Sequence, residues 1–260
     1  MKISINIPSY KRPEVETLKY IPWANVYVDI CELQEYRDNN KGANIIGCPK
    51  GIQGNLCRVR NYIIKQELEI KGNDVCLIVD DDLQYIERFE LKDGFAFTRY
   101  RVSSDELNVF IAKYSQMAKD MGAKFWGIMP NSDNMSYRHN TPFSTRSYIG
   151  GPFQCFLKGN RCFYDENLPL KEDYDMTLQQ LNTERIALRI NSYHYICRQS
   201  TNKGGCATYR NRLREQSQFE ALQRKWGGVI VKRDTSNKGR TSKQKFDDYN
   251  PIIKPPIQGV

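Results

Sequence analysis

Residues 75–86, VCLIVDDDLQYI, place five apolar residues directly before three consecutive aspartates, Asp80, Asp81 and Asp82. The apolar run predicts a buried strand over 75–79 that ends at the aspartates. Two like charges about 4 Å apart repel by roughly 4 kcal/mol at an effective dielectric constant of about 20, so such a cluster needs a positive partner. A divalent cation is the simplest candidate, because Mg²⁺ or Mn²⁺ suits carboxylates combined with substrate phosphates.

Alternating strands and helices surround this strand in the sequence. One helix is marked by a capping box, in which Ser103 and Glu106 satisfy the first backbone amides, and by Gly122, which is suited to end it. The other segments with strand or helix patterns are strands over 2–7, 25–29, 124–129 and 186–190 and helices over 58–68 and 172–181. This alternation predicts the α/β class, with a mainly parallel sheet flanked by helices.

Length and composition limit the organisation of the chain. Its 260 residues, of which 40% are hydrophobic and 27% charged, suffice for one sizeable core. We expect a main domain over 1–206 and a basic C-terminal extension over 207–260 that is helical and then extended. No apolar run approaches the ~20 residues of a membrane span, and the N-terminal segment lacks a signal-peptide pattern. A cytoplasmic protein without a membrane partner is therefore expected.

The eight cysteines form no CxxC pair. Several of them stand inside apolar runs, which favours reduced core residues. The alternative is a zinc site assembled from distant cysteines, although the usual ligand spacing is missing.

The positive charge is concentrated near the C-terminus. The net charge is +9, and the stretch from Arg198 to Lys245 alone carries thirteen Lys or Arg against three acidic residues. It also contains Tyr209, Phe219 and Trp226, and cations combined with flat rings are typical of surfaces that bind phosphates and exposed bases. A polyanionic partner is therefore expected, and the alternative is a solvated basic tail.

Unusual residues follow three of the predicted strands at the end where open parallel sheets bind ligands. They are Pro8, Tyr10 and Arg12 after the first strand, Asp29 at the end of the second, and the aspartate triplet. In an extended backbone Asp80 and Asp82 point the same way and Asp81 points oppositely. A metal site at Asp80 and Asp82 is one interpretation, and a helix cap or a solvated turn is the other.

The order of several short motifs carries a family resemblance. These motifs are NIPSYKRP, VYVD, GNLCRVRN, LIVDDD, YIGGPF and CFYDENLPLKEDYD. Over roughly residues 1–206 they resemble the GT-A glycosyltransferases and, within that class, the phage TET-associated DNA glycosyltransferases. The resemblance implies a Rossmann-like GT-A sheet, a UDP-sugar donor with Mn²⁺ or Mg²⁺, and DNA containing a hydroxymethylated pyrimidine as the acceptor.

The resemblance also implies roles for individual residues. Asp29 would accept a hydrogen bond from the uracil base, Asp80 would touch the ribose, and Asp82 would bind the metal with Asp80. His194 would supply a third metal ligand, although a hydrogen-bonded core histidine is the alternative. The remaining residues expected around the donor are Pro8, Tyr10, Arg12, Arg58, Arg60, Asn61, Asp81, Gly150 and Gly151.

The acidic segment KEDYD is expected to supply the general base. Inverting enzymes of this class use one carboxylate at the start of a helix, and the segment offers Glu172, Asp173 and Asp175. The resemblance favours Asp173, with Glu172 beside it. Acidic residues in the first turn of a helix also simply favour its dipole, which is the structural alternative.

Three other functions are compatible with parts of the sequence. A non-catalytic nucleic-acid-binding protein would explain the basic segment but leaves the carboxylates at three strand ends without a role. A metal-dependent nuclease would use carboxylates and DNA but has no need for the IPSYKR and GNLCRVRN motifs. A glycosyltransferase acting on a polysaccharide or a protein would leave the local positive charge unexplained.

Overall fold

A computed structural model describes the chain except for residues 93–95, 134–135, 199–203, 235–248 and 257–260. Ten strands form one sheet in the order β3-β2-β1-β4-β9-β7-β10-β5-β6, and β8 pairs with β10 beside this path. The strands are β1 (Ile3–Pro8), β2 (Asn25–Asp29), β3 (Asn44–Cys48), β4 (Val75–Val79), β5 (Leu83–Lys92), β6 (Ala96–Arg101), β7 (Phe125–Met129), β8 (Phe143–Ser144), β9 (Phe153–Leu157) and β10 (Leu188–Cys197).

Five α-helices accompany the sheet in the described part of the chain. They are α1 (Leu33–Asn39), α2 (Leu56–Ile64), α3 (Ser104–Asp120), α4 (Glu172–Thr183) and α5 (Arg212–Trp226). The capping box of Ser103 and Glu106 is formed at α3, and Gly122 follows this helix with a positive φ of 78°, as predicted. None of the described helices is long and apolar enough to cross a membrane.

The sheet combines a parallel half with an antiparallel insertion. Strand β1 runs parallel to β2 and β4, and β2 runs parallel to β3, so their carboxyl ends meet at one edge. Strand β9 is antiparallel to both β4 and β7, and β5 and β6 are antiparallel to their neighbours. The α/β fold class is confirmed. The sheet also contains antiparallel pairs, because β9, β5 and β6 join it, and these strands were not predicted.

Alternate residues of β4 belong to two hydrophobic cores. Leu77 and Val79 pack with residues of α3 on one face, whereas Cys76 and Ile78 pack with residues of α2 and α4 on the other. Because β4 is buried along its whole length, its end positions the aspartate triplet rigidly. All eight cysteines are free, and five of them are buried, as expected for core thiols.

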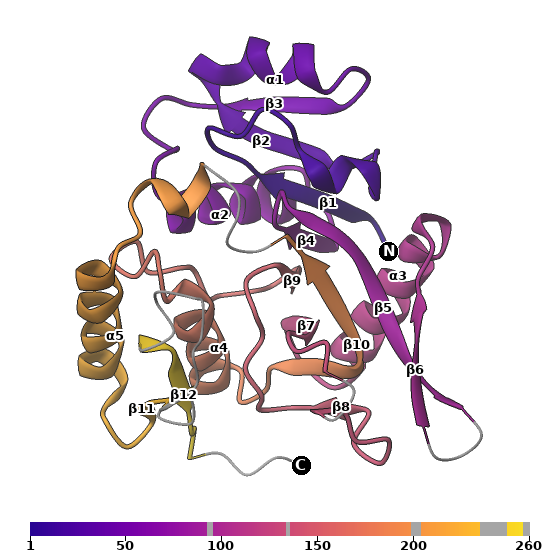
Figure 1. The fold of residues 1–260 in the computed structure, drawn as a ribbon, viewed down its shortest axis with the longest axis vertical. Helices are drawn as coiled ribbons and strands as arrows, with labels where there is room; N and C mark the ends of the chain where they lie inside the picture. The colour runs from indigo at the N-terminus through magenta and orange to yellow at the C-terminus, as the bar shows by residue number, and fades with distance from the viewer. Residues whose placement is uncertain (93–95, 134–135, 199–203, 235–248, 257–260) are drawn as a thin grey trace.

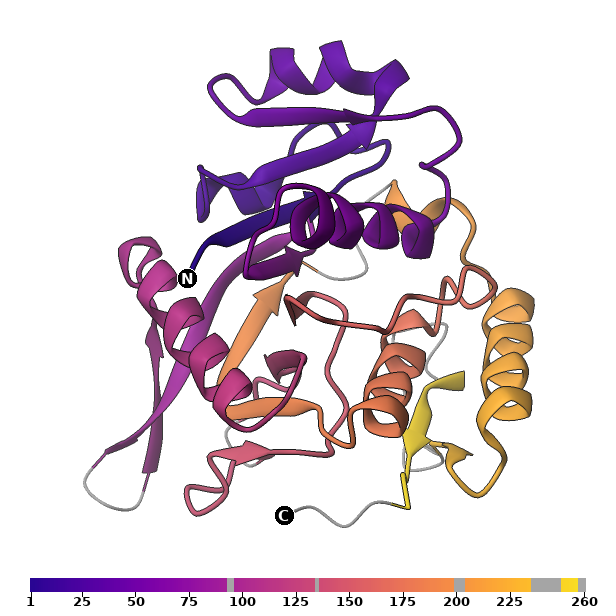
Figure 2. The same ribbon diagram turned by 180° about the vertical axis from the view of Figure 1, so that it is seen from behind.

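The C-terminal segment packs against α4. Helix α5 lies beside α4, next to the hairpin of β11 (Val231–Arg233) and β12 (Pro251–Ile253), at the end of the molecule opposite α1 (Figures 1 and 2). Leu168, Leu178, Phe219, Leu222 and Val231 form their shared core. Most of the tail predicted from Thr235 onward lies outside the described residues.

Candidate active site

The aspartate triplet stands in a turn. The amide of Leu83 donates to the carbonyl oxygen of Asp80 at 3.3 Å, so the chain reverses directly after β4. The predicted alternation of side-chain directions is therefore wrong. The Arg12 guanidinium forms an ion pair with Asp81 and lies 3.8 Å from Asp82, whereas Asp80 accepts a hydrogen bond from Arg60 Nη2 at 2.7 Å.

Asp81 joins the loop after β1 to the end of β4. Ser9 Oγ donates to Asp81 Oδ2 at 2.6 Å, and Arg12 pairs with the other carboxylate oxygen. Burial raises the pKa of Asp81 to about 6, while the charge of Arg12 acts in the opposite direction. The amide of Thr17 donates to the Asp81 carbonyl at 3.2 Å. These contacts enclose Asp81, which was expected to face the donor, and give it a role in holding the loop.

Arg60 is the buried cation at the centre of the cluster. Its Nη2 donates to Asp80 and to the carbonyl of Gly151, the latter at 3.2 Å, and its Nη1 lies 3.4 Å from Glu172 Oε1. Nη1 also donates to Gln154 Oε1 at 3.3 Å. Arg60 therefore connects the end of β4 with the start of α4.

Arg58 and Asn61, which were also expected around the donor, have different roles from Arg60. The Asn61 amide exchanges hydrogen bonds with the backbone of Tyr164 at 2.9 and 2.7 Å. Arg58 donates to Glu166 at 2.9 Å and to the carbonyl of Gly51 at 2.7 Å. Both support the loop before α4, and of the three only Arg60 contacts an aspartate of the triplet.

Asp173 lies at the start of α4 with its carboxylate oriented by three donors. The amide of Gly151 donates to Oδ2 at 3.2 Å, the hydroxyl of Tyr148 donates to the same atom, and the amide of Tyr174 donates to Oδ1 at 2.9 Å. The neighbouring Glu172 is buried. Burial and the charge of Asp173 raise the pKa of Glu172 to about 8, against the effect of Arg60.

The two glycines of the YIGGPF motif lie against groups of the protein itself. A Cβ at Gly150 would lie 2.2 Å from the hydroxyl of Tyr195, and a Cβ at Gly151 would lie 3.3 Å from the Arg60 guanidinium. Both glycines were expected around the donor. Contact with Tyr195 accounts for Gly150, whereas a side chain at Gly151 would require a small shift of the Arg60 guanidinium.

The remaining strand-end residues lie at the same edge of the sheet. Pro8 closes β1 and pairs with Tyr27 of β2. The carbonyl of Tyr10 accepts from the amide of Gly205 at 2.9 Å, so the chain returns to this loop after β10. Asp29 caps the short helix that follows β2, because its carboxylate accepts from the amide of Cys31 at 2.9 Å.

His194 is not a neighbour of the triplet. It pairs with Glu87 across β10 and β5, its Nε2 lies 3.3 Å from Glu87 Oε2, and its ring packs on Phe89 with centroids 4.7 Å apart. The carbonyl of Asp82 instead faces the amide of Arg198, four residues farther along the chain. Burial lowers the pKa of His194 to about 4. The prediction of His194 as a metal ligand is wrong, because the strand register keeps it away from Asp82.

Asp80 and Asp82 remain as the candidate metal ligands. Their side chains are 31% and 16% exposed, and carboxylate oxygens suit a hard cation that takes its other ligands from phosphates and water. No group of three or more His, Cys, Asp or Glu among the described residues is arranged to hold a metal ion alone. Two carboxylates could hold such a cation only together with ligands from outside the protein, such as phosphate oxygens and water.

Sequence comparison assigns the chain to a family. A model for TET-associated glycosyltransferases matches residues 7–205, which include the strand-end loops, Arg60, the aspartate triplet and Asp173. The chain belongs to the TET-associated glycosyltransferase family. It is a glycosyltransferase, as the order of its motifs predicted. None of the curated proteins compared with the chain matches it.

Several solved structures are similar to the chain at low identity and low TM-score. Glucosyl-3-phosphoglycerate synthase from Mycobacterium tuberculosis, in complex with Mn²⁺, UDP and glucosyl-3-phosphoglycerate, is 9% identical with a TM-score of 0.49, covering 90% of this chain and 84% of that chain. A197 from STIV is 12% identical with a TM-score of 0.38, covering 76% and 85%. At these values the family match alone carries the identification.

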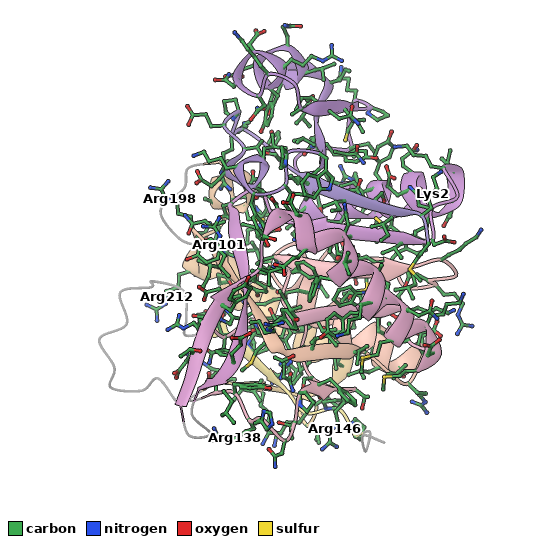
Figure 3. The ribbon with its side chains drawn as sticks, turned by 90° about the vertical axis from the view of Figure 1, so that its right-hand side faces the viewer. Lys2, Arg101, Arg138, Arg146, Arg198 and Arg212 are labelled. Carbon is green, nitrogen blue, oxygen red and sulfur yellow. The ribbon has the colours of Figure 1, made fainter. Side chains whose placement is uncertain are left out.

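Basic side chains from distant parts of this glycosyltransferase lie on one side. Figure 3 shows along one edge of the view the side chains of Arg101, Arg138, Arg198 and Arg212. Lys2 lies on the opposite side. The amide of Arg198 donates to the Asp82 carbonyl at 3.1 Å, so the backbone of one of these arginines lies next to the end of the aspartate triplet.

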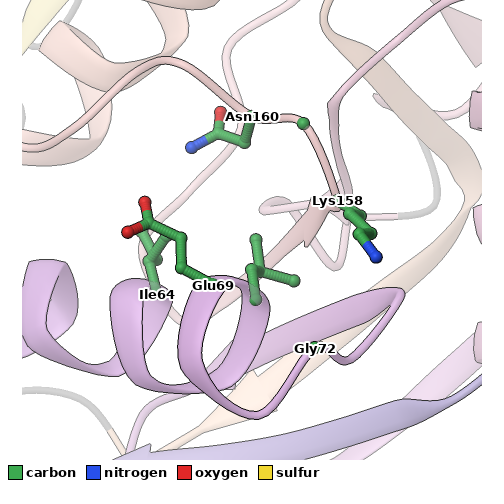
Figure 4. A pocket seen from close by; sticks show the side chains of 7 residues that line it. Ile64, Glu69, Gly72, Lys158 and Asn160 are labelled. Carbon is green, nitrogen blue, oxygen red and sulfur yellow. The ribbon is translucent and has the colours of Figure 1, made fainter.

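Two hollows among the described residues differ in their distance from the site. The first lies between the end of the helical segment Lys65–Ile70 and the turn after β9, is lined by Glu69, Gly72 and Lys158 among others, and has a volume of about 350 Å³ (Figure 4). It stands at the edge of the sheet where β4 begins. The second, of about 540 Å³, is lined by Arg146, Tyr148, Tyr174, Arg189, Ile252 and Lys254 among others.

Two residues of the site escaped sequence reasoning. Tyr148, which holds Asp173, stands in the YIGGPF motif, yet a tyrosine before a glycine pair carries no signal of its role. Ser9, which holds Asp81, is one of many serines that follow strands. Only the contacts across the sheet edge identify these two side chains.

Proposed function

We propose that this glycosyltransferase moves a sugar from a UDP-sugar to a hydroxyl on DNA containing a 5-hydroxymethylcytosine-type base, with inversion at the sugar. One observation carries the proposal. The peptide of Gly151 accepts a hydrogen bond from Arg60, which also holds Asp80, and donates one to Asp173. The Gly151 peptide thereby links a candidate donor site to a candidate base. An in-line displacement requires both to be held in a fixed arrangement around the reacting atoms.

The donor side is built from carboxylates and arginines at the ends of parallel strands. Asp80 and Asp82 would hold Mn²⁺ or Mg²⁺ jointly with the diphosphate. When bound, such a cation neutralises the charge that develops on the leaving group. Arg12 and Arg60 keep the three carboxylates in place, and Pro8, Tyr10 and Asp29 border the same edge, where the uridine is expected.

Asp173 is the proposed general base that accepts the proton of the acceptor hydroxyl. Its three hydrogen bonds orient the carboxylate, and a general base contributes roughly 10²- to 10⁴-fold to such a reaction. Glu172 was also a candidate. Because it is buried beside Arg60, we assign it a positioning role for the Arg60 guanidinium.

DNA is the acceptor that the charge of the protein favours. Membership of the TET-associated family and the basic side marked by Arg101, Arg198 and Arg212 both support a polyanionic acceptor. A neutral polysaccharide or a protein acceptor would leave this basic side unused. Variants that reduce this local charge should therefore distinguish DNA from these other acceptors.

The donor site can be tested by calorimetric titration of UDP with and without Mn²⁺. We expect wild-type affinity to increase at least tenfold with Mn²⁺, and Asp82→Asn to lose most of this increase, because one carboxylate leaves the site. Asp38→Asn, which removes an exposed carboxylate from α1, is the matched control and should behave as the wild type. An unchanged metal effect in Asp82→Asn would remove Asp82 from the site.

Transfer itself requires an acceptor assay. Radiolabelled UDP-sugars are supplied with DNA containing hydroxymethylcytosine, with unmodified DNA, and with a neutral polysaccharide. Label should enter only the modified DNA. Incorporation into the polysaccharide alone would support the alternative glycosyltransferase, and cleavage of DNA without any nucleotide-sugar would support a nuclease.

A further inference from the structure

The hollow of about 540 Å³ beside α4 has a composition suited to nucleic acid. We call it the tyrosine groove, after Tyr148 and Tyr174, whose rings stack with centroids 4.1 Å apart and an interplanar angle of 13°. Arg146, Arg189 and Lys254 also line it, and none of its lining residues is acidic. A groove with flat rings and cations, and without carboxylates, favours a polyanion that carries aromatic bases.

The tyrosine groove adjoins the proposed general base. Tyr148 donates its hydroxyl hydrogen bond to Asp173, and Tyr174 is the next residue along α4. The amide of Gly151 reaches the same carboxylate from the donor side of the site. A molecule whose hydroxyl reaches Asp173 must extend away from the donor, and the tyrosine groove lies next to this carboxylate because Tyr148 and Tyr174 line it.

The cations of the groove come from three separate parts of the chain. Arg146 follows β8, Arg189 belongs to β10, and Lys254 follows β12. Arg146 and Lys254 are at least partly exposed. Arg189 is held in place because it donates to Asn191 at 2.8 Å and to the carbonyl of Tyr148 at 3.1 Å, and although burial lowers its pKa to about 10, it stays charged at neutral pH.

The C-terminal hairpin completes this groove. Pro251, Ile252, Ile253, Lys254 and Pro255 form one wall, and the amide of Lys254 is anchored to the carbonyl of Ile230 at 2.8 Å. The family match ends at residue 205, so this wall lies outside the segment that the family model covers. The hairpin thus contributes lining groups from outside the family segment to a groove beside α4.

We propose that the tyrosine groove binds the DNA strand that carries the target base, with the base against the two rings and its phosphates against Arg146 and Lys254. This inference rests on the proposed function and specifies its acceptor site. Enzymes that modify a base take it from single strands or out of the stack, so an unpaired nucleotide is the expected occupant. The volume of the groove lies within the range of small-ligand sites, which suits one nucleotide.

The test is a salt series of oligonucleotide binding by fluorescence anisotropy. The probe is a labelled single strand of about 12 nucleotides with one hydroxymethylcytosine. Arg146→Gln with Lys254→Gln should flatten the log-log salt slope by about 0.7 for each phosphate that the protein no longer neutralises, and should weaken binding about tenfold at low salt. The matched control, Arg37→Gln with Lys41→Gln, removes the same charge from exposed positions on and after α1 and should keep the wild-type slope.

Two further measurements separate this inference from the proposed function. In transfer assays the groove variant should raise KM for the oligonucleotide while kcat changes less than twofold. Calorimetric UDP binding should remain within twofold of the wild type. A loss of UDP binding in this variant would place the groove on the donor side and overturn the inference.

Equal salt slopes for the groove and control variants would also overturn the inference, as would a wild-type protein that binds no oligonucleotide. Failure of the proposed function has a different signature. A wild-type protein that binds no UDP, with or without Mn²⁺, would reject the donor proposal, whereas the oligonucleotide slopes would still decide whether the groove binds DNA.

Discussion

Two clusters of carboxylates and cations meet at the first turn of α4, and they differ in what they leave accessible. In the first, Arg60 holds Asp80 and lies beside Glu172, and Asp80 remains 31% exposed. In the second, Asp175 is fully buried and accepts hydrogen bonds from Lys225 and Trp226 of α5. The first cluster borders an accessible site, and the second holds α4 against the C-terminal segment.

The basic segment from Arg198 to Lys245 also contains both exposed cations and cations bound in ion pairs. Arg210 Nε lies 2.8 Å from Glu215, which also pairs with Lys171 at 2.6 Å, and both partners of the Lys171–Glu215 pair are only 3% exposed. Charges in this segment therefore serve packing as well as surface binding. A count of charges along the sequence cannot separate these uses, because it does not show that Glu215 is buried between Arg210 and the distant Lys171.

Substitution of Asp173 should have the largest effect. We expect Asp173→Asn to reduce kcat by a factor of roughly 10² to 10⁴, because the amide cannot accept the proton of the acceptor hydroxyl. UDP binding, measured by calorimetry, should stay within about threefold of the wild type. If UDP affinity collapsed with activity, Asp173 would be a binding or structural residue.

Substitution of Asp175 is the matched test in the second cluster. Asp175→Asn should lower the free energy of unfolding by about 2 kcal/mol, because buried hydrogen bonds to charged partners are weakened. Chemical denaturation measures this loss. The kcat of the folded fraction should remain within about threefold, and a loss as large as that of Asp173→Asn would erase the distinction between the two clusters.

The sequence predicted the first cluster better than the second for physical reasons. Strand β4 and helix α3 have strong local patterns, and the carboxyl ends of parallel strands converge by topology, so the aspartate triplet and Arg60 could be expected near one site. The antiparallel strand β9 has no hairpin signal that links it to β4. The pairings of His194 with Glu87 and of Asp175 with Lys225 depend on register and long-range packing, which periodicity does not encode.

Protonation of Glu172 should give the first cluster a smaller, pH-dependent contribution to the free energy of unfolding. Its pKa is raised in the folded protein to about 8 from an ordinary 4.5, so the folded state binds the proton more tightly than the unfolded state. The resulting stability is fully present below pH 4.5 and is lost as pH rises towards 8. Glu172→Gln should remove this loss, so its free energy of unfolding should exceed that of the wild type by about 1 kcal/mol at pH 8.

The control for this prediction is Glu35→Gln on α1, whose side chain is exposed. Denaturation series at pH 5, 6.5 and 8 should show parallel curves for this control and the wild type. Asp81, whose pKa is raised to about 6, adds a loss of the same sign between its ordinary 3.8 and 6 in all three proteins. A Glu172→Gln curve parallel to the wild type would mean that Glu172 is ionised in the folded state.

The smallest expected effect separates surface cations from packing cations in the basic segment. Arg212 and Arg214 are exposed in the first turn of α5, whereas Arg210 is bound to Glu215. Arg212→Gln with Arg214→Gln should flatten the log-log salt slope of duplex DNA binding by up to about 0.9 for each phosphate left without its cation. Affinity near physiological salt should fall only a few-fold, because these cations lie outside the tyrosine groove.

Arg210→Gln should keep the slope and lower the midpoint of thermal unfolding instead. If Arg210→Gln flattened the slope as much as the double variant, Arg210 would contact DNA, and the division between packing and binding cations would not hold in this segment.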